Sequence, residues 1–533
     1  MGQSARRMSP MSLFMLSMNG IIGSGWLFVP FYAAKIVGSA AILSWLIGGF
    51  ATILIAFTFA ELSIMLPVSG TTAHIPQFSH GVLASFIMSF VAWLPAVMLA
   101  PIEVQAILQY ASLFFPSLLH DHHGVPVLSL LGYFWAFIFM VMLCVLNAIS
   151  YKSLVRFNFL LFVFKFFVLL ITIVVIFHAR FTVSNFSSFT PSIFSSQGLQ
   201  LVLSAIATSG IIFAFNGFKS GVDLAGETKN LNVAIPLSTI GSVVTCLLLY
   251  LGLQIAFIGA LDPAFIKNGW QSINYSGDTG PFLGLAAGLG IMWLFYLLYA
   301  NSIIAPFGAG LIYVTSTARI LYAMSRMGYV PRFISRLNHA RFPVWAIVVN
   351  FFVGIISFLP LPGWQAMVSF LVSAVVITYA MGPIALLCLR MTLPHAERPF
   401  RLKAAYIICP VAFYFCNLFS YWTGWQTISK FAIVLLFGLG LFSIAYVRGR
   451  LQITKRDFQS SLWIIVYLCG LIMISYLGSF GGRNIIPFGW DFLIIAIFSL
   501  AIFQMALQSR IQHHSEKISE FLLAESAYFN EKN

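Results

Sequence analysis

Charged residues are scarce in this sequence, and long polar stretches are nearly absent. Only 8% of its 533 residues are Asp, Glu, Lys or Arg, whereas 60% are hydrophobic and the mean hydropathy is +0.95. Soluble globular domains carry about 25% charged residues. This shortage of charge excludes a water-soluble protein and indicates a chain that lives in a lipid bilayer, with no soluble domain left over.

Cysteine is also scarce, and its positions exclude two further classes of protein. The six cysteines all lie within hydrophobic runs and at no metal-ligand spacing; they are Cys144, Cys246, Cys388, Cys409, Cys416 and Cys469. They are therefore interpreted as small core residues rather than as a disulfide framework or a metal site. The spans also lack an HExxH motif and a nucleophile paired with a base, which disfavours a membrane-embedded enzyme.

Apolar runs recur along the chain at the length of a transmembrane helix, about 20 residues. They predict fourteen spans, at residues 11–36, 39–66, 82–115, 127–149, 154–177, 199–222, 234–259, 282–318, 343–361, 365–390, 404–423, 428–447, 461–479 and 489–508. The first run is too long and too rich in glycine for a cleaved signal peptide, so we expect it to remain as the first span. Residues 1–10 and the polar tail at 509–533 are expected to lie in the cytoplasm.

The formal charge of +14 is explained by topology rather than by a nucleic-acid partner. With a cytoplasmic N-terminus and fourteen spans, most basic residues fall on the cytoplasmic side, as the positive-inside rule requires. Three loops hold many of them: Arg319, Arg326, Arg332, Arg336 and Arg341; Arg390, Arg398, Arg401 and Lys403; and Arg448, Arg450, Lys455 and Arg456. The expected location is the inner membrane, with the lipid bilayer as the partner.

Two spans carry residues that interrupt a helix. The first contains residues 19–26 (NGIIGSGW), with three glycines where a membrane helix should be most continuous, and the sixth contains Asn216-Gly217. Close packing against a neighbouring helix is the usual reason for glycine in a membrane span. Two interruptions at matching positions instead favour unwound segments, which survive in lipid only where they line a cavity or meet a ligand.

The spacing of these interruptions predicts an inverted repeat. Each lies in the first span of a block of five, and because five is odd the second block would be inserted upside down relative to the first. The prediction is an all-α, polytopic membrane protein with a 5+5 inverted-repeat core. Its first repeat covers residues 11–177, its second covers 199–390, and four peripheral helices cover 404–508.

At these residues the sequence resembles the amino acid-polyamine-organocation (APC) permeases. The resemblance occurs in family order at residues 19–26 (NGIIGSGW), 61–70 (ELSIMLPVSG), 215–217 (FNG), 225–230 (AGETKN), 235–236 (IP) and 319–331 (RILYAMSRMGYVP). It covers residues 11 to about 390, and the last four spans add no motif. It implies a broken-helix transporter with four peripheral helices and a midplane site. Some members are aspartate/proton symporters, and the sequence is compatible with that subgroup.

The resemblance also implies which backbone groups in the two broken spans hold the substrate. The carboxylate of an amino acid would meet the N–H groups of Ser24 and Gly25, with Gly23 at the turn. Its amino group would meet the carbonyls of Ile21, Phe213 and Asn216. Helix N-termini offer free donors and partial positive charge, and C-terminal ends offer free carbonyls, so a zwitterion fits between them without an ionised side chain.

Lys165 is a charge in the middle of the fifth span, and such a charge is costly enough to need an explanation. Snorkelling to the membrane surface is the simple one, but its depth, nine residues beyond Arg156, argues against it. In some proton-coupled members of the family a lysine on the fifth helix takes the place of a coupling cation, and Lys165 resembles that residue. Burial in a low dielectric favours the neutral amine, so we expect Lys165 to carry the coupled proton.

Glu103 and Lys219 are charges within the third and sixth spans. Many family members carry glutamate at the position of Lys219, and this departure puts in doubt the acidic gate or cation-recognising role that the family pattern would imply. The resemblance implies that Glu103 lines the substrate site, because the same stretch does so in arginine/agmatine exchangers of the family, and Lys219 follows the break in the sixth span. We expect the two residues to form an ion pair across the cavity, because an unpaired charge in a span is costly. The alternative is that Lys219 binds the side-chain carboxylate of aspartate or glutamate.

The remaining titratable residues are assigned outside the substrate site. Glu61 and Glu227 lie near the predicted cytoplasmic ends of the second and sixth spans, where they would form an inner gate or an ion-pair network with the loop arginines. The histidines His74, His80, His120, His122 and His123 are placed in loops. Solvated histidines are the better interpretation than a metal site. No cofactor and no metal are expected.

The function that these features predict is secondary transport of an amino acid by alternating access, coupled to protons as a symport. An amino acid or amine exchanger is the alternative. A channel is disfavoured because two asymmetric helix breaks suit an occluded binding site rather than a selectivity filter. The identity of the substrate stays open, because the backbone groups that bind a zwitterion suit nearly all amino acids.

Overall fold

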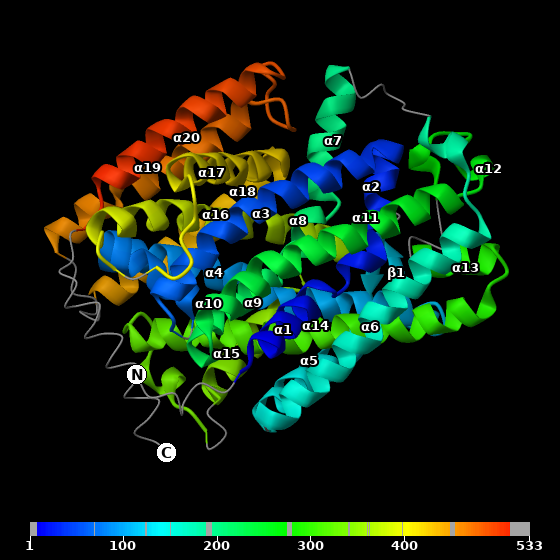
Figure 1. Cartoon of the computed structure of the whole chain (residues 1–533), viewed down its shortest axis with the longest axis horizontal. Helices are drawn as coiled ribbons and strands as arrows, with labels where there is room; N and C mark the ends of the chain where they lie inside the picture. The colour runs from blue at the N-terminus through cyan, green and yellow to red at the C-terminus, as the bar shows by residue number, and fades with distance from the viewer. Residues whose placement is uncertain are drawn as a thin grey trace.

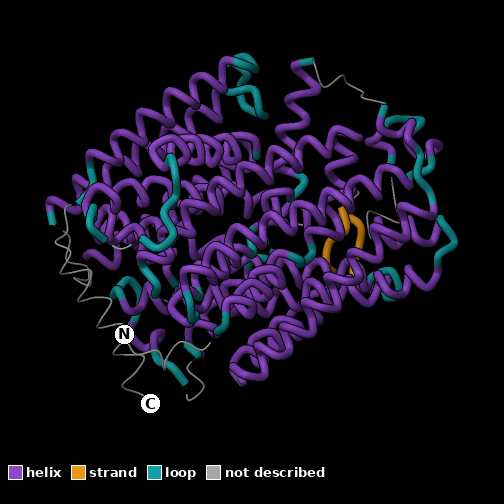
Figure 2. Tube along the Cα trace, in the orientation of Figure 1, coloured by secondary structure: helices purple, strands orange, loops and turns teal. Residues whose placement is uncertain are grey.

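The computed structural model is helical almost throughout, with a single two-stranded hairpin among the residues it describes (Figure 2). Those residues are 8–68, 70–122, 125–149, 151–187, 195–273, 280–338, 342–359, 361, 363–396, 398–447 and 454–511. Most of residues 1–10 and of the tail at 509–533 fall outside them, as do His123, Arg341, Arg448 and Arg450. The hairpin pairs β1 (Leu119–His122) with β2 (Val125–Leu128) in antiparallel register.

Twenty α-helices make up the described chain. They are α1 (Pro10–Ile21), α2 (Gly25–Val37), α3 (Ala41–Met65), α4 (Thr71–Ala111), α5 (Leu130–Ile149), α6 (Tyr151–Ala179), α7 (Ser196–Thr208), α8 (Ile211–Phe215), α9 (Phe218–Asp223), α10 (Leu231–Pro236), α11 (Ser242–Ala260), α12 (Pro263–Ile266), α13 (Pro281–Gly288), α14 (Met292–Arg326), α15 (Val344–Ile356), α16 (Gly363–Thr392), α17 (Ala405–Trp422), α18 (Trp425–Val447), α19 (Lys455–Leu477) and α20 (Trp490–Gln508).

These helices form an all-α polytopic membrane protein. Within the described residues, ten segments are long and apolar enough to cross a bilayer, and a bent pair, Ser196–Thr208 with Ile211–Asp223, makes an eleventh. One of the ten, Gly25–Met65, runs through α2 and α3 and so covers parts of the first two predicted spans. The ninth and twelfth predicted spans correspond to shorter apolar helices, Val344–Ile356 and Trp425–Gly440. Helices satisfy their backbone polar groups internally, which is what lipid requires.

The interior is built around α4, which packs most extensively against α14 and α16. In Figure 1 α17, α19 and α20 run along the upper left of the molecule, whereas α5 and α6 lie along its lower right edge. In the same view α1, α8 and α9 lie between these outer groups, and α7 stands at the upper edge. Helix α1 contacts α6, α9 and α14. The breaks are therefore in the interior of the bundle.

The first predicted break is confirmed, and the second is displaced. Between α1 and α2 the helix is interrupted over residues 22–24, as the glycines predicted. In the sixth span the 45° bend lies at Ser209-Gly210, before the predicted position, because Gly210 adopts the left-handed conformation with φ 98°. Asn216 and Gly217 do separate α8 from α9, but both keep right-handed helical dihedrals, so the chain turns only slightly there.

Two other predicted spans differ from single straight helices. The eighth, expected to be continuous from residue 282, is divided into α13 and α14 because Gly290 adopts a positive φ of 75°. The third begins earlier than predicted, at Thr71, and bends at Gly81. This extension takes His74 and His80 out of the loops predicted for them and buries both within α4, with 1% and 0% exposure.

Candidate functional site

The break in the first span exposes backbone groups that other helices satisfy. Gly20 and Ile21, at the end of α1, accept hydrogen bonds through their carbonyls from the hydroxyls of Tyr313 (2.7 Å) and Tyr250 (2.8 Å). The carbonyl of Ile21 also accepts a bond from the N–H of Gly23 at 2.9 Å. Side chains of α14 and α11 therefore stabilise the unwound segment by hydrogen bonding to its free carbonyls.

Glu103 occupies the position expected for a substrate carboxylate. Its Oε2 accepts a hydrogen bond from the backbone N–H of Ser24 at 2.7 Å, while its Oε1 has no hydrogen-bond partner among the described residues. Glu103 is fully buried on α4. The N-terminus of α2 thus binds a carboxylate in this structure, as the physics of helix N-termini predicts, but the carboxylate belongs to the protein itself.

Glycine is required at the break because the carboxylate lies so close to the backbone. A Cβ on Gly23 would overlap Oε1 of Glu103 and would approach the Cβ of Ala309 to 2.9 Å. A Cβ on Gly25 would lie 3.0 Å from the Cβ of Ala214, on α8. The two glycines therefore let α1, α2, α4 and α8 converge around one point.

The predicted ion pair between Glu103 and Lys219 is wrong for this structure. Glu103 instead bonds to Ser24 and interacts electrostatically with Lys165. The amine of Lys219 lies over the rings of Phe59 and Tyr379, 4.9 Å and 5.3 Å from their centroids. Each charge therefore has other partners, and the two do not form an ion pair.

Lys165 bridges three helices from a fully buried position. Its Nζ donates hydrogen bonds to the carbonyls of Asn19 (2.6 Å) and Ile22 (2.5 Å) beside the helix break and to that of Ala305 (3.3 Å) on α14. All three donors of a charged amine are thereby used. Snorkelling does not occur, and the amine instead occupies a carbonyl-lined cation position between α1, α6 and α14.

The carbonyls expected to receive a substrate amino group are already engaged in part. That of Phe213 accepts a bond from the N–H of Asn216 (3.0 Å), and that of Asn216 accepts one from the N–H of Lys219 (3.2 Å). The side-chain oxygen of Asn216 accepts a hydrogen bond from the hydroxyl of Tyr379. A carbonyl oxygen has two lone pairs, so those of Phe213 and Asn216 each keep one acceptor position. The carbonyl of Ile21 already accepts two bonds, from Tyr250 and Gly23, and is therefore not open to a substrate in this structure.

Gly217 brings the two broken spans into direct backbone contact. A Cβ on Gly217 would overlap the backbone of Gly20 and Ile21 in α1. Conversely, a Cβ on Gly20 would lie 3.4 Å from the Cα of Gly217. This is the close-packing role that glycine often has in membrane helices. Gly217 therefore joins the two breaks, whereas Gly210 supplies the bend.

Asp223 is a buried carboxylate that the sequence pattern did not single out. It lies one helical turn after Lys219 at the end of α9, interacts electrostatically with it, and accepts a bond from the N–H of Thr72 at 3.2 Å. Its spacing of four residues from Lys219 was a usable signal, because residues at i and i+4 share a helix face. The predicted span ended at residue 222, which left Asp223 outside it.

An aromatic cluster closes the site on the side that the predicted topology makes extracellular. The indole N–H of Trp364, on α16, donates to the hydroxyl of Ser24 at 2.8 Å. Its ring lies 4.7 Å from Phe28, 6.0 Å from Tyr32 and 5.7 Å from Phe213, measured between centroids. Nothing in the sequence pattern marked Trp364, because its role depends on two helices that are far apart in the chain.

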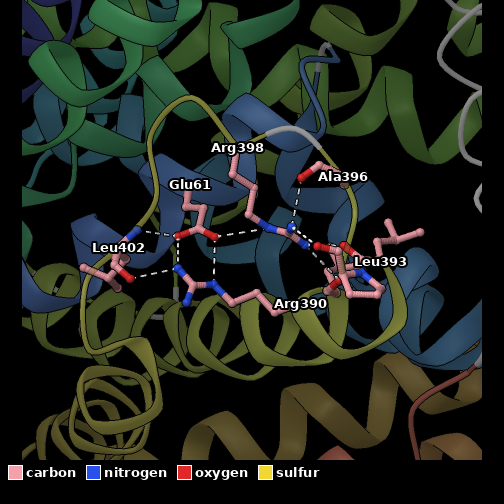
Figure 3. Close-up of polar contacts among 8 residues, drawn as sticks. Glu61, Arg390, Leu393, Ala396, Arg398 and Leu402 are labelled. Carbon is pink, nitrogen blue, oxygen red and sulfur yellow. Dashed lines mark hydrogen bonds and ion pairs between the residues drawn. The ribbon is translucent and has the colours of Figure 1, made fainter.

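Ion pairs lie on the opposite side, which the predicted topology makes cytoplasmic. In Figure 3 the carboxylate of Glu61 receives two hydrogen bonds from Arg390, at 2.8 Å and 2.6 Å, and one from the N–H of Leu402 at 2.7 Å. Arg398 lies 3.5 Å from Glu61 and donates to the carbonyl of Leu393 at 2.5 Å. The cluster fastens the connection between α16 and α17 to the end of α3.

Glu227 forms the second ion pair on this side, with Arg319 at 2.8 Å. The guanidinium of Arg319 also lies over the ring of Phe342, 5.7 Å from its centroid. Both glutamates thus face arginines, as predicted, but Arg319 lies within α14 and Arg390 within α16 rather than in the loops predicted for them. A gating role for either remains a prediction, because an ion pair in one state does not show that it opens in another.

A metal site is not indicated by the described part of the chain, where no group of three or more potential protein ligands gathers. His120 and Asp121 are exposed on β1, and His123 lies outside the described residues. The buried His80 bonds to the carbonyl of Ala506 at 2.9 Å instead.

Comparison with known proteins agrees with this architecture. Residues 8–442 match the model of the amino acid permease family. The glutamate/serine transporter AimA of Bacillus subtilis is 35% identical over 518 residues, covering 96% of this chain and 95% of the relative. The aspartate-proton symporter of the same organism is 33% identical over 510 residues, covering 95% and 96%. The chain therefore belongs to the amino acid permease family of the APC superfamily, near the branch that contains these two transporters.

Proposed function

We propose that this permease carries an amino acid, with acidic amino acids as its main substrates, across the membrane together with a proton. Two relatives that align over nearly the whole chain support the proposal: one is named a glutamate/serine transporter and the other an aspartate-proton symporter. The alternative is an exchanger, in which the outward movement of a second substrate molecule drives uptake in place of the inward movement of a proton.

The hydrogen bond from Ser24 to Glu103 is the observation that carries the proposal. In it, an N–H group freed by the first break holds a carboxylate in the dry interior. In the transport cycle the carboxylate of the substrate takes this position and Glu103 withdraws. Trp364, bonded to the hydroxyl of the same serine, then covers the bound substrate on the outer side.

Lys165 supplies the proton in this scheme. As a charged amine it joins α6 to the carbonyls of α1 and α14, with three hydrogen bonds. A neutral amine has only two N–H donors, so loss of the proton leaves a carbonyl of the break or of α14 unpaired in a region without water. Protonation of Lys165 is thereby linked to the packing of α1, the helix that carries the substrate position.

The proposal is tested with purified protein in proteoliposomes. Uptake of labelled glutamate, aspartate and serine is measured with and without an inward proton gradient. Saturable uptake that the gradient drives, into vesicles empty of amino acid, is expected for a symporter. Uptake only into vesicles preloaded with substrate would establish the exchanger, and no uptake of any amino acid would contradict the proposal.

Lys219→Ala is expected to weaken the transport of acidic amino acids in particular. If Lys219 leaves Phe59 and Tyr379 to bind the side-chain carboxylate, its loss removes one charge-assisted hydrogen bond. That loss is expected to raise KM for glutamate by about 10-fold to 100-fold. Serine, which has no such carboxylate, should be affected far less. The measurement is the ratio of KM values for the two substrates.

The double variant Lys219→Ala with Asp223→Asn separates binding from ion pairing. Lys219→Ala alone leaves the buried Asp223 without its nearby charge, and the second substitution removes that carboxylate. Recovery of glutamate uptake in the double variant would show that Lys219 only balances Asp223. If the double variant still has a raised KM for glutamate relative to serine, the result supports direct binding of the substrate by Lys219.

A further inference from the structure

The bend in α4 is the feature of the core that the transport scheme leaves unexplained. Gly81 adopts φ 86° and ψ −169°, a conformation essentially restricted to glycine, and it separates residues 71–80 from the long second part of α4 that carries Glu103. A bend of this kind interrupts the hydrogen bonds between successive turns. The backbone groups on both sides of it need partners from elsewhere, because an unpaired buried group is costly.

Three of these groups are satisfied by the C-terminal helices. The N–H of Val82 donates to Oδ1 of Asp457 at 3.2 Å. The carbonyl of His80 accepts a bond from the hydroxyl of Ser460 at 2.6 Å, and that of Ser79 accepts one from the N–H of Ile511 at 3.0 Å. Asp457 and Ser460 lie in the first turns of α19, and Ile511 follows α20. The peripheral helices therefore supply the hydrogen-bond partners of the backbone groups that the bend leaves free.

Asp457 serves two helices with one carboxylate. Its Oδ2 accepts bonds from the N–H and the hydroxyl of Thr454, at 3.0 Å and 2.6 Å, which completes the capping box of α19. Its Oδ1 caps the second part of α4 at Val82. Gly81, which stands at the capping position of that helix, has no side chain to do this. A Cβ on Gly81 would overlap both Oδ1 of Asp457 and the side chain of Ile511.

The N-terminal end of the first part of α4 is hydrogen-bonded to the end of the broken sixth span. Asp223, at the end of α9, accepts a bond from the N–H of Thr72 through its side chain (3.2 Å) and from the N–H of Gly70 through its carbonyl (2.9 Å). The short helical segment at residues 71–80 thus joins the end of the broken sixth span to α19 and α20.

We propose that α19 and α20 position the third span, and that Asp457 is the positioning residue. By capping α4 at Val82, Asp457 fixes where the second part of the helix begins, and Glu103 follows about six helical turns later. The hydrogen bond between Glu103 and the N–H of Ser24 then depends on a carboxylate of α19 that caps the second part of α4 at its N-terminal end. This assigns a role to peripheral helices that no motif explained, and it does not depend on the substrate or on the coupling ion.

Hydrogen–deuterium exchange of the full-length protein in lipid nanodiscs tests the proposal. Asp457→Ala is expected to raise the exchange rate of a peptide covering residues 79–88 by about fivefold, the usual effect of losing a helix cap. It should also raise exchange at the amide of Ser24, which Glu103 protects. Thr454→Ala is the matched control, because it removes the hydroxyl that bonds to Oδ2 of the same carboxylate and leaves the bond from Oδ1 to Val82.

Exchange at the Ser24 amide is the decisive measurement, because it would not change if Asp457 stabilised only the neighbourhood of the bend. Unchanged exchange at Ser24 in Asp457→Ala, with or without a change at residues 79–88, would overturn the positioning of Glu103. If Asp457→Ala does not accumulate, Asp457→Asn and Ser460→Ala each weaken the same connection and must show the same two increases. Failure of amino acid uptake would count against the proposed function and would leave these exchange results standing.

Discussion

Replacing Lys165 by alanine is expected to lower proton-driven uptake by about 100-fold. The substitution removes three hydrogen bonds, to the carbonyls of Asn19, Ile22 and Ala305, from a region that water does not reach. A cost of about 1–3 kcal/mol for a buried group left unpaired accounts for a loss of this size. Initial uptake rates in proteoliposomes, with and without a proton gradient, measure the effect.

Lys165→Gln separates the proton from the hydrogen bonds. A glutamine amide can donate to two of the carbonyls but cannot gain or lose a proton, so exchange of substrate across the membrane should survive while gradient-driven accumulation is lost. Lys430→Ala, at an exposed position on α18, is the control for loss of a lysine. A Lys165→Ala protein that kept its full dependence on the proton gradient would rule out Lys165 as the proton carrier.

Gly217→Ala is expected to have the largest effect on folding. Its methyl group would overlap the backbone of Gly20 and Ile21, so α1 and α9 would have to separate at the point where the two broken spans meet. Overpacking of a tight core costs about 1–3 kcal/mol, and more where the backbone must move. We expect a lower melting temperature in detergent and transport reduced to background.

The control for Gly217 is an alanine in a glycine position with open space. Gly440, exposed on α18, has no atom within 4 Å of an added Cβ, and alanine favours a helix by about 1 kcal/mol over glycine. Gly440→Ala should therefore leave the melting temperature unchanged or raise it. Equal melting temperatures for the Gly217→Ala protein and its parent would contradict the close contact between α1 and α9.

The broken first span could be predicted from the sequence because its signal is local. Three glycines within residues 19–26 oppose a continuous helix wherever they occur. The bend of the sixth span was predicted about six residues beyond its actual position, because the local signal there is misleading. Asn216-Gly217 looks like a break, but Gly217 serves close packing and keeps helical dihedrals, while the single Gly210 adopts a positive φ. Sequence alone does not tell a packing glycine from a bending one.

The partners of buried charges could not be predicted from the sequence. The cost of burial correctly marked Lys165, Glu103 and Lys219 as residues that need an explanation. Their partners depend on which helices are neighbours, so the predicted Glu103–Lys219 pair failed and the bond to Ser24 was not foreseen. Trp364 and Asp457 carried no signal at all, because each acts on a helix more than 300 residues away in the chain.

A structure of the permease with glutamate bound tests the central claim most directly. If the first break is the substrate site, the α-carboxylate of the ligand will lie within hydrogen-bond distance of the N–H of Ser24, and the side chain of Glu103 will have moved away. If Glu103 still holds that N–H while the ligand binds elsewhere, the break is a structural joint and the proposed substrate position is wrong.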